Sequence, residues 1–251
     1  MNVPIGLISS SYGGTVIEAW TSWDIMGKDE QFKTIDLDAK EKENAGMQEK
    51  INNYREAMKN DKGELEKWYA GDDTSGGWKA MELPQLWEKT EVGNADGIVW
   101  FKKEFDLLPV MEGKPATIHL GPVDDDDVTY LNGKKIGTTV GYNIDRVYRV
   151  DPFLLQQGKN TIVVKVIDNG GGGGLYGTPE QLFIDGNGSK ISLAGAWQYK
   201  PSALTTQYGV VDAGPNSFPS QLYNAMIAPL VPLSIKGGNL VPRRVKYIGS
   251  I

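Results

Sequence analysis

Residues 116–133 read ATIHLGPVDDDDVTYLNG, and this stretch decides the fold class. Ile118 and Leu120 alternate with polar side chains, which is the period of a β-strand with one buried face. The acidic run Asp124 to Asp127 separates this segment from a second apolar one, which ends at the turn pair Asn132-Gly133. Short strands joined by such turns are typical of an all-β domain.

The same pattern continues over residues 97–199, where turn pairs such as Gln157-Gly158 separate short apolar segments. This spacing predicts a jelly-roll β-sandwich over residues 90–199. Its expected inward-facing residues are Trp100, Ile118, Leu131, Val164 and Val166. The expected strands are 98–105, 116–120, 128–131, 147–150, 161–167, 181–184 and 190–199.

The flanking sequence has a different character. Residues 1–35 begin with an apolar segment, Val3 to Ile8, and continue through a glycine turn to a short helix near residues 16–20, an α/β pattern. A helical insert is expected over residues 36–89, because Met47, Ile51, Tyr54 and Met58 form a stripe at helical spacing. Residues 200–251 form a second flanking segment, with a short helix over 222–230. The fold class is therefore mainly β, a jelly roll with flanking α/β segments and a helical insert.

Composition excludes several classes of protein. The formal charge of −6 gives no electrostatic footprint for nucleic acid. No apolar run reaches the roughly 18 residues of a membrane span, and the N-terminus has no basic region typical of a signal peptide. Cysteine is absent, so disulfides and thiolate metal sites are excluded, but the compartment stays undetermined.

His119 is the chain's single histidine, and it lies on the polar face of its expected strand. We interpret it as a structural or solvent-facing residue rather than a catalytic base. No G-D-S block, G-x-S-x-G elbow or S-x-x-K motif supplies a serine nucleophile. We therefore assign no catalytic residue and expect no ester hydrolysis by this chain alone.

For two motifs we prefer a structural interpretation to a ligand-binding one. Gly172, Gly174 and Gly177 match G-x-G-x-x-G, but a new strand follows at once and leaves no room for a phosphate-binding helix. We interpret them as a sandwich loop in which another surface approaches the backbone closely. The acidic run 124–127 and the segment 185–189 lack the spacing of a calcium loop and are expected to cap turns. No metal and no cofactor is predicted.

Several runs, taken in order, resemble the sialate O-acetylesterase family of SGNH hydrolases. They are PIGLI (4–8), SSYGGT (10–15), IEAW (17–20), DGIVWFKKEF (96–105), LGPVDD (120–125), DVTYLNG (127–133), LAGAW (193–197) and PSQLYNAMIAPL (219–230). The resemblance covers about residues 3–237 and ends before the tail 238–251.

This resemblance implies an SGNH catalytic domain interrupted by a galactose-binding-like jelly roll, with O-acetylated sialic acid or another glycan as ligand. It also implies that Gly13 or Gly14 donates its backbone N–H to an oxyanion hole. The family's serine, asparagine, aspartate and histidine blocks are missing, so the chain looks like an inactive internal fragment of a carbohydrate esterase. Members of the family are often exported.

Two alternatives stay open: a carbohydrate-binding module and a structural insert. Aromatic residues on a concave face would favour binding, and aromatic residues buried in the sandwich would favour a structural role. We also expect segments 3–20 and 219–237 to pack together, and we expect the chain to self-associate as a homo-oligomer through their apolar surfaces.

Overall fold

The computed structural model describes residues 8–13, 15–32, 36–70, 76–210 and 218–233. The chain divides into two compact units, one of residues 1–49 and 212–251 and the other of residues 50–211. The second unit contains the sandwich. No helix among the described residues is long and apolar enough to cross a membrane.

Strands dominate the sandwich unit. Within the described residues they are β1 (Lys79–Leu83), β2 (Gly97–Asp106), β3 (Ala116–Asp124), β4 (Asp126–Leu131), β5 (Lys134–Val140), β6 (Asp145–Val150), β7 (Lys159–Asp168), β8 (Gly174–Leu175), β9 (Leu182–Gly186), β10 (Ser189–Ser192) and β11 (Gly195–Leu204). The α-helices are α1 (Trp23–Met26), α2 (Leu37–Lys59) and α3 (Lys62–Leu65). Single 3-10 turns are η1 (Ile17–Trp20), η2 (Glu30–Phe32), η3 (Trp68–Ala70), η4 (Trp87–Lys89), η5 (Pro109–Met111), η6 (Pro152–Leu154), η7 (Pro179–Gln181), η8 (Thr205–Tyr208) and η10 (Ala228–Leu230), and η9 (Tyr223–Ile227) is a π turn.

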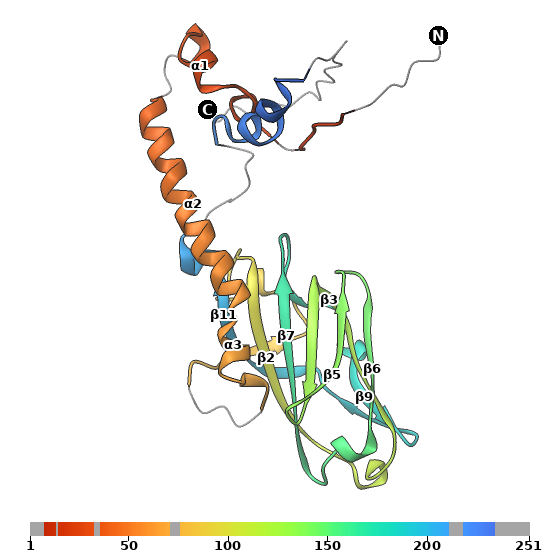
Figure 1. Ribbon diagram of the computed structural model, residues 1–251. Helices are drawn as coiled ribbons and strands as arrows, with labels where there is room; N and C mark the ends of the chain where they lie inside the picture. Colours follow the sequence, from red (N-terminus) through yellow and green to blue (C-terminus); the bar gives the residue numbers. More distant parts are fainter. Residues whose placement is uncertain (1–7, 14, 33–35, 71–75, 211–217, 234–251) are drawn as a thin grey trace, which may run out of the picture. The chain divides into compact units, whose positions relative to one another are not determined.

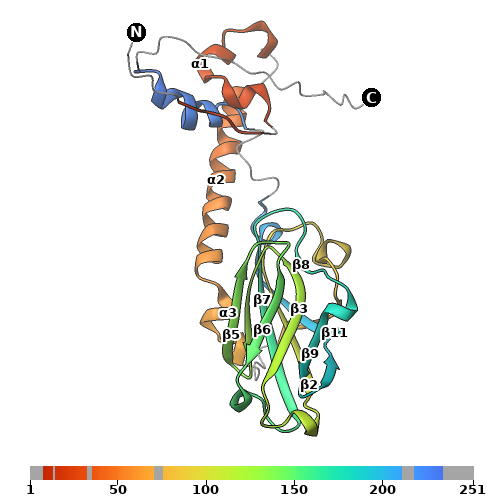
Figure 2. The ribbon, with the colours of Figure 1, turned by 90° about the vertical axis from the view of Figure 1, so that its right-hand side faces the viewer.

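Two antiparallel sheets face each other (Figures 1 and 2). The larger sheet has the order β1-β11-β2-β7-β4-β5, and the smaller has the order β10-β9-β3-β6, with β8 paired to β3. The predicted mainly β sandwich is confirmed. The expected strand 190–199 is two strands, β10 and β11, and the edge strands β1 and β5 were not predicted.

The core fills the space between the sheets because each strand turns alternate side chains inward. Ile118 and Leu120 of β3 and Val164 and Val166 of β7 are fully buried in it, as expected. Trp87 and Trp197 also contribute to this core. Burial of each such large apolar side chain contributes about 1.5–3 kcal/mol.

The outer face of the larger sheet is covered by the segment that follows α2. Trp68, from η3, packs against Trp100 and Tyr130 of the sheet in a second buried cluster. Asp61, the N-cap of α3, pairs with Lys165 of β7 at 2.7 Å and also accepts hydrogen bonds from Trp100 and Ser202. Trp100 is therefore buried as predicted, but on the opposite face of its strand from the sandwich core.

The helix predicted from the stripe at residues 47–58 is confirmed as part of α2. In the terminal unit, described residues of the segments 3–20 and 219–237 are in contact, as expected. The backbone N–H of Ser220 donates to the carbonyl of Glu18 at 2.8 Å, and its hydroxyl donates to the carbonyl of Thr21 at 2.7 Å. The strand expected over residues 3–8 lies outside the described residues except for Ile8, and the tail 238–251 lies wholly outside them.

Candidate functional site

The outer face of the smaller sheet presents an organised polar surface. Along β3, Thr117 and His119 point away from the buried Ile118 and Leu120, and along β6 Arg149 points away from Tyr148. The sheet's pairing sets these outward side chains in rows, because residues opposite each other on antiparallel strands lie side by side.

One row crosses four strands of the smaller sheet. Thr117 on β3 lies opposite Arg149 on β6 and, on its other side, opposite Asp185 on β9. Asp185 in turn lies opposite Lys190 on β10. The sequence of side chains across the sheet is therefore a cation, a hydroxyl, a carboxylate and a cation.

Phe183 organises the neighbouring row. Its ring stacks on His119, with the centroids 4.2 Å apart and the planes inclined by 15°. The ammonium of Lys190 lies 4.1 Å from the centre of the Phe183 ring. His119 Nε2 approaches Oδ1 of Asp185 at 3.3 Å, which ties the two rows together.

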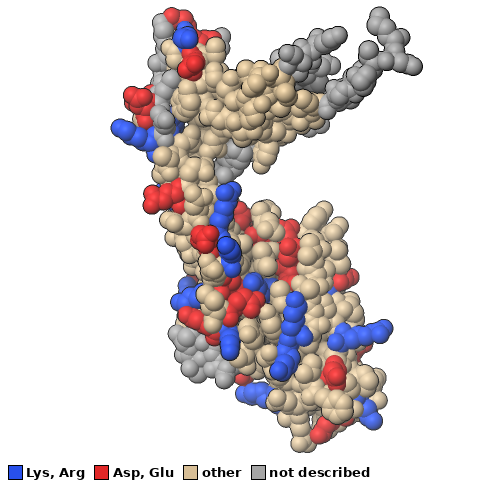
Figure 3. Space-filling view, viewed as in Figure 1, with Lys and Arg blue, Asp and Glu red and all other residues tan. Residues whose placement is uncertain are grey.

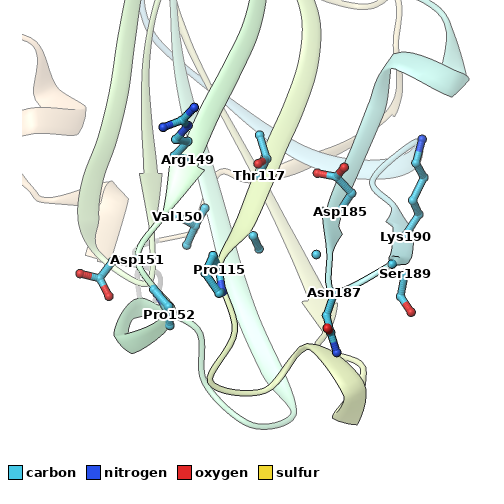
Figure 4. Close-up of a pocket in the computed structure, with 13 residues that line it drawn as sticks. Pro115, Thr117, Arg149, Val150, Asp151, Pro152, Asp185, Asn187, Ser189 and Lys190 are labelled. Carbon is cyan, nitrogen blue, oxygen red and sulfur yellow. The ribbon is translucent and has the colours of Figure 1, made fainter.

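A pocket of about 780 Å³ opens where this face meets the strand ends (Figure 4). Its apolar floor includes Pro115, Ala116 and Val150, and its polar wall includes Thr117, Arg149, Asp151, Asp185, Asn187, Ser189 and Lys190. Figure 4 shows these side chains coming from the ends of β3 and β6 and from the β9–β10 hairpin. Phe153, next to the pocket residue Pro152 in the chain, is 95% exposed. A shallow pocket with directed polar groups and an accessible ring can recognise a small polar ligand.

His119 packs within the polar surface of the smaller sheet. Its side chain is 27% exposed, and its described partners are Asp185 and Phe183. No described serine hydroxyl contacts it, so no serine–histidine pair forms among the residues that the structure describes.

Side chains of the acidic run, residues 124–127, accept hydrogen bonds within the sandwich. Asp127 is fully buried and accepts from Arg146 Nε at 2.9 Å and from the hydroxyl of Tyr148. Asp126 accepts from the backbone N–H of Gly141. The second segment, 185–189, is the tight β9–β10 hairpin, with Asn187 and Gly188 at positive φ, and it lines the pocket. In the described part of the chain no group of three or more histidine or acidic side chains is arranged to hold a metal.

Carboxylates of the chain accept hydrogen bonds from backbone amides in and next to the glycine run, residues 170–174. Asn169 N–H donates to Asp125 at 2.9 Å, Gly170 N–H to Asp168 at 2.8 Å, and Gly173 N–H to Glu88 at 2.9 Å. A Cβ on Gly173 would lie 2.1 Å from the Trp87 ring, which confirms the expected close approach to the backbone. Between Gly177 and β9 the chain forms only the three-residue turn η7, so the helix that a phosphate-binding G-x-G-x-x-G motif requires does not follow the match.

Two carboxyl groups near the glycine run, those of Asp168 and Asp124, have raised pKa values. Asp168 is fully buried, and one of its oxygens, Oδ2, has no hydrogen-bond partner. Burial raises its pKa to about 7; the Gly170 N–H opposes the rise, and the charges of Asp96, Asp125 and Asp124 add to it. Burial, followed by the hydrogen bond with Asp125, also raises the pKa of Asp124 to about 6.

Both signs of charge are interspersed over the sandwich surface visible in Figure 3, with no single-sign field on that side. Gly13 and Gly14, the candidates for the oxyanion hole, belong to the terminal unit and not to the sandwich unit. Gly13 sits in an exposed bend of the terminal unit, and Gly14 lies outside the described residues.

No family model matches this chain. A curated protein of Formosa agariphila named "Putative beta-glucuronidase" is 28% identical over 94 residues, which are 36% of this chain and 11% of that protein. Among solved structures, Ruminococcus gnavus β-glucuronidase matches with a TM-score of 0.39 and 18% identity, over 55% of this chain and 25% of that one. Bacteroides uniformis β-glucuronidase matches with a TM-score of 0.38 and 21% identity, over 52% of this chain and 15% of that one. These structural likenesses are too low to assign an activity.

The resemblance to the sialate O-acetylesterase family is wrong, because the curated protein that aligns is named as a β-glucuronidase. The esterase function inferred through it, and the oxyanion role of Gly13 and Gly14, lose their basis. The physical reason lies in the motifs. The runs 120–125 and 127–133 form parts of β3 and β4 and the turns beside them. Their residues are therefore explained by the strands and turns of a sandwich and do not indicate a catalytic domain.

Proposed function

We propose that the sandwich is a carbohydrate-binding module, which uses the outer face of its smaller sheet. The observation that carries this proposal is the polar row of Arg149, Thr117, Asp185 and Lys190 above the pocket. Sugars are bound by directed hydrogen bonds together with contacts to apolar rings, and this face offers both.

The two outer faces of the sandwich differ in a way that supports this choice. On the larger sheet, Trp68 and its neighbours bury the outer side around Trp100, Tyr130 and Val163. On the smaller sheet Val147, Arg149 and Lys190 are exposed. The alignment with a protein named as a glycosidase agrees with a glycan ligand, but it gives no reason to keep sialic acid as that ligand. Self-association stays a prediction.

A structural role is the second candidate, and the tryptophans favour it. Trp68, Trp87, Trp100 and Trp197 are all fully buried, so none of them offers a stacking surface to a sugar. Stacking on a sugar would then depend on Phe153, which is 95% exposed, because His119 and Phe183 are half-buried and stack on each other.

Affinity electrophoresis against a panel of neutral and acidic polysaccharides tests the proposal. Thr117→Tyr places a bulky ring at the centre of the polar row and should abolish retardation without altering the thermal midpoint. Thr161→Tyr is the matched control, because Thr161 is a similarly half-exposed residue of β7, in the other sheet. If no polysaccharide retards the chain, or if both variants behave alike, the structural role is the better account.

A further inference from the structure

Some polar side chains of the pocket already have a partner in the chain, and others have none among the described residues. Oδ1 of Asp185 is engaged by His119 at 3.3 Å, and Oδ1 of Asp151 accepts from the backbone N–H of Phe153 at 2.9 Å. One oxygen of each carboxylate of the pocket therefore lies against a partner in the chain. The amide N–H₂ of Asn187 is also engaged, by the carbonyl of Val110.

The two cations are not held in this way. Within the described residues, the guanidinium of Arg149 makes no hydrogen bond or ion pair with the chain, and its side chain is exposed. Lys190 contacts the Phe183 ring, but its ammonium donates to no described acceptor. The hydroxyl of Thr117, which lies opposite Arg149, is likewise uncommitted. The groups that remain for a ligand are thus two charged donors, Arg149 and Lys190, and the hydroxyl of Thr117.

We infer that this pocket selects an anionic glycan, whose carboxylate or sulfate oxygens accept from Arg149 with Thr117 beside it; this inference rests on the proposed carbohydrate-binding function. The planar guanidinium presents a rigid fork that matches such oxygens in a bidentate manner. Neutral hydroxyls would leave its charge unmatched and gain only ordinary hydrogen bonds.

The width of the row indicates the size of the ligand. Arg149 and Lys190 lie on β6 and β10, the two outermost strands of the β10-β9-β3-β6 order. Three strand spacings amount to about 14 Å. A ligand that reaches both cations is thus an oligosaccharide with more than one acidic group, and its hydroxyls would face Thr117 and Asp185 between them.

Isothermal titration with three oligosaccharides of equal length tests the inference: one of uronic acids, one bearing sulfate esters and one neutral. Tightest binding of the uronate identifies carboxylate as the anion, and tightest binding of the sulfated chain identifies sulfate. Arg149→Gln should weaken the preferred acidic ligand by about tenfold or more while leaving the neutral one unchanged. Arg149→Lys should restore part of the loss, and added salt should weaken only the acidic ligands.

Lys135→Gln serves as the matched control, because Lys135 is an exposed cation of β5 in the other sheet, and it should change no affinity. Equal binding of all three ligands, unaffected by Arg149→Gln, would overturn the anionic preference and leave the carbohydrate-binding function standing. Binding of none of them, on this panel and on the polysaccharides above, would overturn both.

Discussion

Arg146 donates a hydrogen bond from Nε to Oδ1 of Asp127 at 2.9 Å, and both side chains are fully buried. The remaining guanidinium N–H groups donate to the carbonyls of Asp125, Gly141 and Ile144. One buried cation therefore holds the β5–β6 connection to the β3–β4 turn.

Removal of this cation should be costly. Arg146→Met leaves Asp127 charged and buried without its partner, so we expect a loss of about 3–5 kcal/mol in the free energy of unfolding. Lys159→Met is the control: its pair with Glu104 joins side chains that are 66% and 54% exposed, so its loss should change the free energy of unfolding far less. Urea unfolding measures both. Similar losses in the two variants would show that the buried pair has no special weight.

Asp168 should make the sandwich less stable as the pH rises. Its folded pKa is about 7 against an ordinary value of 3.8, so between those values the folded chain keeps a proton that the unfolded chain has lost. The free energy of unfolding then falls with increasing pH through this window. Asp168→Asn stays neutral and can still accept from Gly170, so it should be more stable than the wild type at pH 8 by on the order of 2 kcal/mol.

Unfolding curves measured from pH 5 to pH 8 isolate this effect as the difference between variant and wild type. That difference should be smallest at pH 5 and grow with pH up to about 7, the folded pKa of Asp168. A difference that does not vary with pH would mean that Asp168 is already ionised at pH 5.

Gly173→Ala should destabilise the glycine run, because the added Cβ would lie 2.1 Å from the buried Trp87 ring. Overpacking of this kind costs about 1–3 kcal/mol. Gly46→Ala gives the opposite sign: Gly46 is exposed within α2, has no atom within 4 Å of its Cβ position, and should gain up to about 1 kcal/mol from helix propensity. Thermal midpoints distinguish the two, and a stabilised Gly173→Ala would contradict the packing of the loop.

Trp68→Ala should loosen the segment that covers the larger sheet. Trp68 is almost fully buried, makes an edge contact with Trp100 at 6.1 Å, and lies under the ammonium of Lys200 at 3.9 Å. We expect a loss of about 3–5 kcal/mol. Tyr142→Ala, at a ring that is 57% exposed, should change the stability by less than about 0.5 kcal/mol. Near-UV circular dichroism with urea unfolding checks both. Loss of glycan binding in folded Trp68→Ala at low temperature would place the binding face on the larger sheet instead.

The central strands could be predicted from the sequence, but two edge strands could not. β2, β3, β4, β6, β7 and β9 carry apolar residues dense enough to reveal their period. β1 and β5, the edges of the larger sheet, are mostly exposed and begin with lysines such as Lys79 and Lys134. Charged, half-solvated edges resist further pairing, and for the same reason they lack a sequence signal.

Part of the candidate site could be predicted from the sequence. The alternation of Thr117 and His119 with buried residues, and of Arg149 with Tyr148 and Val150, shows that these side chains point outward. Nothing local indicates that β3 lies between β6 and β9, and that order alone brings Arg149, Thr117 and Asp185 into one row. Phe183 was missed because its strand is short and its role depends on neighbours from two other strands.

The sequence by itself determined the strand period, the turns and the helix at residues 47–58, because these depend on residues close together in the chain. Only the tertiary structure decided which face each buried residue serves. Trp100 and Phe101 are adjacent and equally buried, yet Phe101 lies in the sandwich core and Trp100 lies beneath Trp68. A strand with both faces buried has no period that distinguishes them. Which outer face stays open to a ligand depends in the same way on what packs against it from elsewhere in the chain.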